Sequence, residues 1–162
     1  MKKMNFQRNT VQSLSPVIDK DSEILILGTM PGKESLRSKE YYASPNNSFW
    51  KIMKRLFNSN MEFKNYEEKI SCLKKHHIAL WDTLQFCERE SSLDSNIKEE
   101  EYNDIDGLLS RHPKIKKVVF NGKKAANYYK TQLPFSIAYS TSNACAKKVE
   151  EKIQNWENAL IY

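Results

Sequence analysis

Four short runs of apolar residues do most to limit the fold that this chain can adopt. Each run is continuous rather than alternating with polar residues, which is typical of parallel strands that are covered by helices on both faces. Each is also only about as long as an ordinary strand. We expect strands at about 23–28, 77–81, 116–121 and 135–140.

Helical patterns separate these runs. Apolar residues between Phe49 and Phe57 recur at the three- and four-residue spacing of an amphipathic helix. Strands that alternate with helices predict an α/β fold, specifically a three-layer α/β/α sandwich around a central four-stranded, mostly parallel sheet. Further helices are expected at about 65–75, at about 101–111, after Gly122, and along the stripe Val149, Ile153, Trp156 and Leu160.

Two further expectations concern the segments between these elements. Ser142 or Asn143 is a candidate N-cap for the last helix, because short polar side chains are preferred there. Residues 84–98 are polar and are expected to form a loop. No repeat or low-complexity linker divides the chain, so we expect one domain spanning residues 1–162.

Composition excludes several classes of protein. No apolar run approaches the roughly 18 residues of a membrane span, and the basic start of the chain lacks the apolar core of a signal peptide. The three cysteines, Cys72, Cys87 and Cys145, are far apart, which suits a reducing compartment and gives no metal-ligand spacing. We therefore expect a cytoplasmic protein with no metal and no membrane association.

The net charge of +6 and the isoelectric point near 9.1 permit a polyanionic partner. Short basic clusters lie beside predicted strands or turns, and such clusters are either solvated surface or phosphate contacts. Two of them, Lys123-Lys124 and Lys147-Lys148, flank loops at which a site is expected. Lys123, Lys147 and Lys148 are therefore candidate phosphate contacts.

In open α/β sheets, binding sites form outside the carboxyl ends of the strands. This rule selects the loops Gly28–Gly32, Trp81–Leu84, Asn121–Lys124 and Ser140–Ala146. The first of them matches neither a Walker loop nor a dinucleotide-binding fingerprint, so no nucleotide cofactor is expected. It is either a tight strand exit or a floor where backbone amides approach a small planar ligand.

Other residues near this edge leave alternatives open. Tyr41 and Tyr42 are either core aromatics or rings that stack on a nucleobase. Asn47 is either a helix N-cap or an amide that holds a water or reads a base edge, and the two roles can coexist. Asp82 is either a general base or a turn and capping residue. No hydrolytic triad is present, and each of the histidines is assigned a structural or surface role.

Several segments together resemble the hypoxanthine-DNA (deoxyinosine) glycosylases, a branch of the uracil-DNA glycosylase superfamily. The resemblance covers almost the whole chain in the right order. The segments that carry it are Gly28–Gly32, Ser35-Leu36, Tyr41-Tyr42-Ala43-x-Pro45-x-Asn47-x-Phe49-Trp50, Ile78–Asp82, Cys87-Glu88-Arg89-Glu90, Ser92-Leu93-Asp94-Ser95 and Phe120–Ala125.

The resemblance implies a monofunctional glycosylase, which flips a deaminated base out of double-stranded DNA and hydrolyses its N-glycosidic bond without a cofactor. It implies a monomer located with its DNA substrate in the cytoplasm, at the nucleoid. The catalytic residue would be Asn47. Contacts to the base would come from Gly28, Thr29, Met30, Pro31, Gly32, Tyr42, Phe49, Asp82 and Asn121, and contacts to DNA from Ser140, Thr141, Ser142, Asn143, Lys123, Lys147 and Lys148.

The chain departs from the family pattern at two places. Met30 stands where the mismatch-specific uracil glycosylases have a water-holding Asn, which argues against uracil or thymine mispairs as substrates. Asn143 and Cys145 stand at the Pro and Asn positions of the family's last loop, which motivates a second alternative, a non-catalytic DNA-binding protein of this fold. A small-molecule nucleotide-binding protein is a third alternative, but the chain lacks a phosphate loop.

Overall fold

A four-stranded parallel sheet forms the centre of the protein. The structure is a computed structural model and describes residues 10–58, 60–89 and 97–161. The strand order is β3-β2-β6-β7, and all neighbours are parallel. The strands are β2 (Ile24–Gly28), β3 (Ile78–Asp82), β6 (Lys117–Asn121) and β7 (Phe135–Ala138). All four expected strands are therefore present, and the predicted fold class is confirmed.

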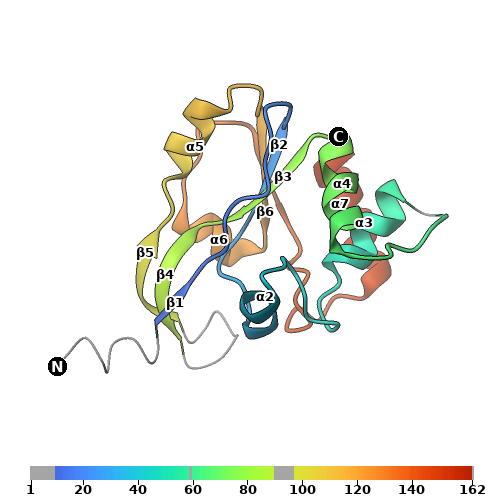
Figure 1. The fold of residues 1–162 in the computed structure, drawn as a ribbon, viewed down its shortest axis with the longest axis horizontal. Helices are drawn as coiled ribbons and strands as arrows, with labels where there is room; N and C mark the ends of the chain where they lie inside the picture. The colour runs from blue at the N-terminus through green and yellow to red at the C-terminus, as the bar shows by residue number, and fades with distance from the viewer. Residues whose placement is uncertain (1–9, 59, 90–96, 162) are drawn as a thin grey trace.

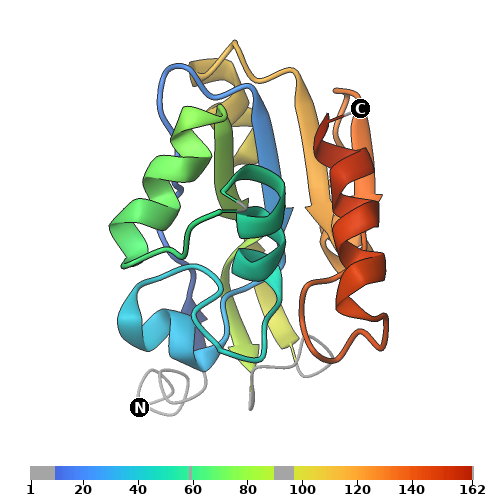
Figure 2. The ribbon, with the colours of Figure 1, turned by 90° about the vertical axis from the view of Figure 1, so that its right-hand side faces the viewer.

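Helices cover both faces of this sheet (Figures 1 and 2). Alternate residues of β2 point to opposite faces, so that Ile26 packs in one apolar cluster while Leu25 and Leu27 pack in the other. The first cluster is completed by α3 (Phe49–Phe57), α4 (Tyr66–Lys75) and α7 (Val149–Ile161), and the second by α5 (Ile105–Arg111) and α6 (Lys123–Tyr128). Because both of their faces are covered, β2, β3 and β6 are mostly apolar, and the site is left to the sheet's carboxyl edge.

A second sheet corrects the expectation of a polar loop at 84–98. It is antiparallel, with the order β1-β4-β5, and consists of β1 (Thr10–Gln12), β4 (Leu84–Arg89) and β5 (Ile97–Tyr102). Polar residues are compatible with strands here because one face of an antiparallel sheet can meet water. The partner β1 comes from the far amino end of the chain, so local composition did not reveal the pairing. The motif Ser92-Leu93-Asp94-Ser95 lies outside the described residues.

The starts of two helices differ from expectation, and one short helix was not predicted. The helix expected from about 101 begins at Ile105, where the Asp104 carboxylate accepts a hydrogen bond from the Gly107 amide at 3.0 Å. The last helix begins at Val149, so neither Ser142 nor Asn143 is its N-cap; the Ser142 hydroxyl instead accepts from the Ala144 amide at 3.2 Å. A short helix that the sequence did not predict, α2 (Lys33–Ser38), follows the Gly28–Gly32 loop.

No helix within the described ranges is both long enough and apolar enough to cross a lipid bilayer.

Candidate active site

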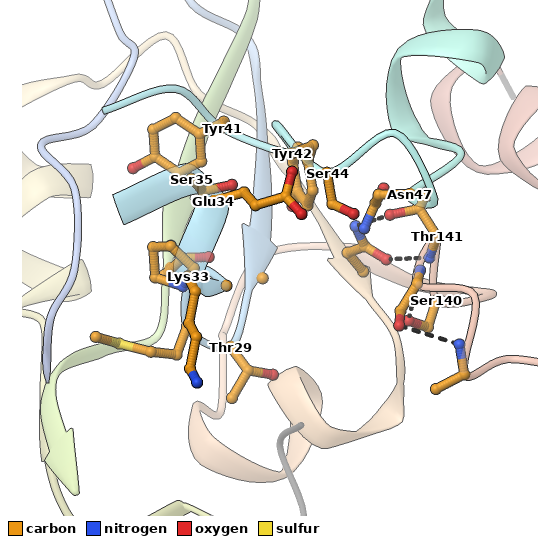
Figure 3. Close-up of a pocket in the computed structure, with 18 of the residues that line it drawn as sticks. Thr29, Lys33, Glu34, Ser35, Tyr41, Tyr42, Ser44, Asn47, Ser140 and Thr141 are labelled. Carbon is orange, nitrogen blue, oxygen red and sulfur yellow. Dashed lines mark hydrogen bonds between the residues drawn. The ribbon is translucent and has the colours of Figure 1, made fainter. Parts of the chain in front are cut away.

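A cavity of about 640 Å³ opens at the carboxyl edge of the parallel sheet (Figure 3). All four loops selected from the sequence contribute to it, together with residues of α2 and of the segment that leads to α3. The predicted site residues that line it are Gly28, Thr29, Met30, Pro31, Gly32, Tyr42, Asn47, Asp82, Asn121, Ser140, Thr141, Ser142 and Asn143. The structure therefore brings together most of the residues that were expected to form the site.

Gly28 is required by a close approach of two side chains. It lies opposite Asp82 in the ladder between β2 and β3. A Cβ atom on Gly28 would lie 2.6 Å from Asp82 Oδ1 and 3.1 Å from Tyr42 Oη. The first distance is shorter than any normal van der Waals contact, so a larger residue would displace the carboxylate. Gly28 thus allows Asp82 and Tyr42 to converge on the cavity floor.

Asp82 is almost completely buried, with 3% of its surface exposed. It ends β3, and the next element is the strand β4, so it is not a helix cap. Its backbone carbonyl accepts a hydrogen bond from Asn103 Nδ2 at 2.8 Å. Burial, and then the nearby Asp82 carboxylate, raise the pKa of Tyr41 far above its usual value. A buried carboxylate thus lies beside the aromatic pair.

Met30 lies on the floor of the cavity and turns away from water. Only 8% of its surface is exposed, and it packs against Leu84 and Tyr128. Its thioether is a weak hydrogen-bond acceptor and cannot donate. The Met30 side chain therefore gives the cavity floor an apolar surface, where an Asn side chain would provide an amide group.

Tyr42 has a backbone φ of +55°, in the left-handed region that bulky residues rarely occupy. Its ring stacks on the ring of Phe49, with the centroids 4.1 Å apart and the planes 20° from parallel. Phe49 itself is fully buried and does not line the cavity, which corrects the expectation that it contacts the substrate. Phe49 supports Tyr42 from behind because it belongs to the inward stripe of α3.

Asn47 lines the cavity just before α3. Its Oδ1 accepts a hydrogen bond from the Phe49 amide at 2.9 Å, although Ser48 rather than Asn47 is the N-cap residue. Its backbone amide donates to the Ser44 carbonyl at 3.0 Å, which closes a tight turn. Asn47 is therefore not the N-cap of α3, but its side chain bonds the first amide of that helix while the residue lines the cavity.

The loop after β7 is held by Asn121 and Thr141. Asn121 Nδ2 donates to Thr141 Oγ1, and the Thr141 amide donates to Asn121 Oδ1, both at 3.0 Å. The Ser48 amide donates to the Thr141 carbonyl at 2.9 Å. Both ends of the Asn121 amide are thus used within the protein, so Asn121 connects the sheet to this loop, at the position where a base contact was expected.

The lysines expected to contact DNA lie outside the cavity lining, and two other cations line it. Lys123, Lys147 and Lys148 are exposed but do not line it, and Lys147 Nζ lies over the ring of Tyr139, 5.2 Å from the centroid. The cavity is instead lined by Lys33 and Arg37 of α2, which share one face of that helix. Their four-residue spacing was the available signal, but the helix itself was not predicted. The other lining residues that were missed are Glu34, Ser35 and Ser44, while Tyr41 and Ala144 line the cavity as parts of segments that the sequence had already indicated.

Among the described residues, no three His, Cys, Asp or Glu side chains are grouped so that they could hold a metal ion.

Comparisons with known proteins place this geometry in a family. The model of the uracil DNA glycosylase superfamily matches residues 15–161. A hypoxanthine DNA glycosylase of Methanosarcina barkeri (strain Fusaro) is 35% identical over 157 residues, which cover 92% of this chain and 97% of the relative. A hypoxanthine DNA glycosylase of Methanosarcina acetivorans is 43% identical over 112 residues, or 69% and 71% of the two chains.

A solved structure agrees with these matches. The solution NMR structure of a Methanosarcina acetivorans protein, proposed in its description to be a uracil DNA glycosylase, superposes with a TM-score of 0.81 at 34% identity. The match covers 93% of this chain and 96% of that one. The chain belongs to the uracil DNA glycosylase superfamily. The assignment to the DNA glycosylases, which are hydrolases acting on DNA, is thereby confirmed.

Proposed function

We propose that this protein releases hypoxanthine from double-stranded DNA by hydrolysing the N-glycosidic bond of a flipped deoxyinosine. The observation that carries the proposal is that Tyr42 and Asn47 line one cavity in a chain that resembles hypoxanthine DNA glycosylases over most of its length. The same proposal includes three further points: residues 1–162 form one domain, the protein acts as a monomer, and it acts at the nucleoid in the cytoplasm.

Tyr42 would hold the flipped base. Phe49 covers one face of its ring, and the ring also lines the cavity, so the remaining surface can stack on a purine. Stacking of a base on an aromatic side chain contributes about 1–3 kcal/mol. Stacking on Tyr42 compensates part of the free energy needed to take the base out of the duplex. That free energy is smallest for a damaged or mispaired base.

Asn47 would position the attacking water. The Phe49 amide orients the side chain by donating to Oδ1, and a carbonyl oxygen has a second lone pair that can accept a hydrogen bond from a water. The water oxygen bonds to C1′ as the bond from C1′ to the base breaks, and the bonding electrons leave with the base. One proton of the water finally passes to the departing base. No strong base is needed if bond breaking runs ahead of attack.

The Gly28–Gly32 loop would stabilise the negative charge that develops on the leaving base. Thr29 to Gly32 line the cavity, so the backbone of this loop lies beside the place of a bound base. Backbone amides aimed at developing charge act like an oxyanion hole. Lys33 and Arg37 would meet phosphates beside the flipped nucleotide, and Ser140, Ser142 and Asn143 would meet the backbone from the opposite rim.

A panel of duplexes tests this function. Each duplex carries one hypoxanthine, xanthine or uracil, and alkali cleaves the strand wherever the base has been released. We expect cleavage with hypoxanthine at a rate well above that with the other bases. A protein that binds all duplexes in a salt-sensitive way and cleaves none would be a non-catalytic DNA-binding member of the fold.

Uracil is the second candidate base, because the similar solved structure carries the description of a uracil DNA glycosylase. Met30 argues against it, since its side chain is turned into the apolar floor and cannot hold a water or read a base edge. Faster cleavage of the uracil duplex in the same panel would mean that uracil, not hypoxanthine, is the preferred base.

A further inference from the structure

The backbone of Tyr42 needs support from its surroundings. With φ at +55°, it adopts a conformation that is strained for a residue with a large side chain. Such conformations persist only where neighbouring groups hold them in place, and they are concentrated at functional sites. The question is therefore which groups hold Tyr42.

Two buried side chains hold the peptide groups on either side of Tyr42. The Tyr41 carbonyl, in the peptide before it, accepts a hydrogen bond from Trp50 Nε1 at 2.8 Å. The Ala43 amide, in the peptide after it, donates to Ser35 Oγ at 3.0 Å. Ser35 and Trp50 are only 5% and 7% exposed, so water does not readily replace either bond. Rotation about φ or ψ of Tyr42 would break one of them.

The same backbone conformation determines where the ring lies. It brings the ring onto Phe49 and places Oη close to Gly28, at the cavity floor beside Asp82. A change of φ to the ordinary negative range would swing the side chain away from both. Ser35 and Trp50 therefore act on the shape of the cavity through Tyr42.

We propose that Ser35 is a positioning residue, which holds Tyr42 in its left-handed conformation so that the ring forms the base-stacking wall of the cavity. The consequence for catalysis rests on the proposed function. Ser35 is the clearer residue to test, because Trp50 also packs in the apolar core between Phe63 and Tyr66. Ser35 lies on α2, where its hydroxyl accepts from Ala43, eight residues further along the chain.

Ser35→Ala tests the proposal against Ser38→Ala. The control removes a hydroxyl from the same helix, but Ser38 is exposed, donates to the Glu34 carbonyl at 2.8 Å and does not line the cavity. We expect Ser35→Ala to slow single-turnover release of hypoxanthine about tenfold, the usual effect of one hydrogen bond. Ser38→Ala should keep the wild-type rate, and Ser35→Cys, which retains a weak acceptor, should lose less than Ser35→Ala.

A double-mutant cycle distinguishes positioning from a general loss of structure. If Ser35 acts through Tyr42, then Ser35→Ala should slow release little further once Tyr42→Ala is present. An equal slowing in both backgrounds, or a wild-type rate in Ser35→Ala, would overturn the proposal.

A spectroscopic measurement is independent of activity, and so of whether the proposed function holds. In tyrosine-labelled protein, the NMR ring signals of Tyr42, identified by their loss in Tyr42→Phe, are displaced by the stacked Phe49 ring. They should move towards ordinary tyrosine positions in Ser35→Ala and Ser35→Cys but not in Ser38→Ala. Unmoved signals in a folded Ser35→Ala protein would contradict the positioning role, even if no base is released by any variant.

Discussion

The side-chain oxygen of Asn47 can accept two hydrogen bonds, and the Phe49 amide provides one of them at 2.9 Å. This contact orients the amide at the start of α3, while the turn closed by the Ser44 carbonyl presents the residue to the cavity. A single residue thus connects the beginning of a helix with the place where a water would be held.

Asn47→Ala should reduce hypoxanthine release by about 10²-fold, the usual effect of misplacing a reactant, because the attacking water loses the group that positions it. Affinity for the duplex should change little, because other residues of the cavity would make the phosphate and stacking contacts. Single-turnover kinetics and a binding titration measure the two effects. Asn46→Ala is the matched control, since Asn46 is exposed and does not line the cavity. Full activity of Asn47→Ala would remove Asn47 from the mechanism.

At the scale of elements, the loop after β7 depends on groups from three other parts of the chain. Asn121 of β6 and the Ser48 amide before α3 hold Thr141. Lys152 of α7, only 2% exposed, donates from Nζ to the Ser142 carbonyl at 3.1 Å. A buried lysine costs free energy of desolvation, so its presence here indicates a role in shaping the loop rather than in stability.

Lys152→Met should therefore leave the free energy of unfolding unchanged or slightly higher, since an apolar side chain of similar length replaces a buried charge. The KM for the duplex should rise several-fold, because the Ser142 carbonyl loses its support and the loop shifts. Urea unfolding and steady-state kinetics measure the two quantities. The exposed residue Gln154 on the same helix supplies the control Gln154→Met. Clear destabilisation with an unchanged KM would assign Lys152 to the core instead.

At the scale of the whole molecule, the cations at the amino ends of the parallel strands (the amino edge) and those at the carboxyl ends (the carboxyl edge) have different surroundings. At the amino edge, Lys114 and Lys116 pair with Asp21 and Glu23 at 2.9 and 3.0 Å. The hydrogen bond from Lys114 holds the pKa of the Asp21 carboxyl below its usual range. At the carboxyl edge, Lys33 and Arg37 line the cavity. The net charge of +6 does not indicate which of the two edges would bind DNA, whereas the position of the cavity indicates the carboxyl edge.

The salt dependence of duplex binding should distinguish the two edges. Each phosphate contact changes the slope of log K against log salt by about 0.9. The pair Lys33→Gln and Arg37→Gln should thus make the slope shallower by about 2, whereas Lys114→Gln and Lys116→Gln, which remove the same charge, should leave it nearly unchanged. Equal changes in the two double variants would mean that only total charge matters and would contradict phosphate contacts at α2.

Much of the fold could be predicted from the sequence, because its main elements leave local signals. The runs that became β2, β3 and β6 are buried on both faces, and burial requires continuous apolar sequence. The small antiparallel sheet could not be predicted in this way. Its strand β4 is specified by pairing with β1 and β5, and β1 lies more than 70 residues away.

The candidate site, like the fold, could be predicted from local sequence only in part. The sequence by itself determined which loops meet at one edge, because parallel strands place all their carboxyl ends together. A recognisable motif also indicated Tyr42 and Asn47 as candidates, and both line the cavity. Only the tertiary structure decided that Phe49 lies behind Tyr42, that Asn121 holds a loop and that Lys33 and Arg37 border the cavity. The direction in which a side chain points depends on contacts between residues distant in the chain, and local sequence does not record those contacts.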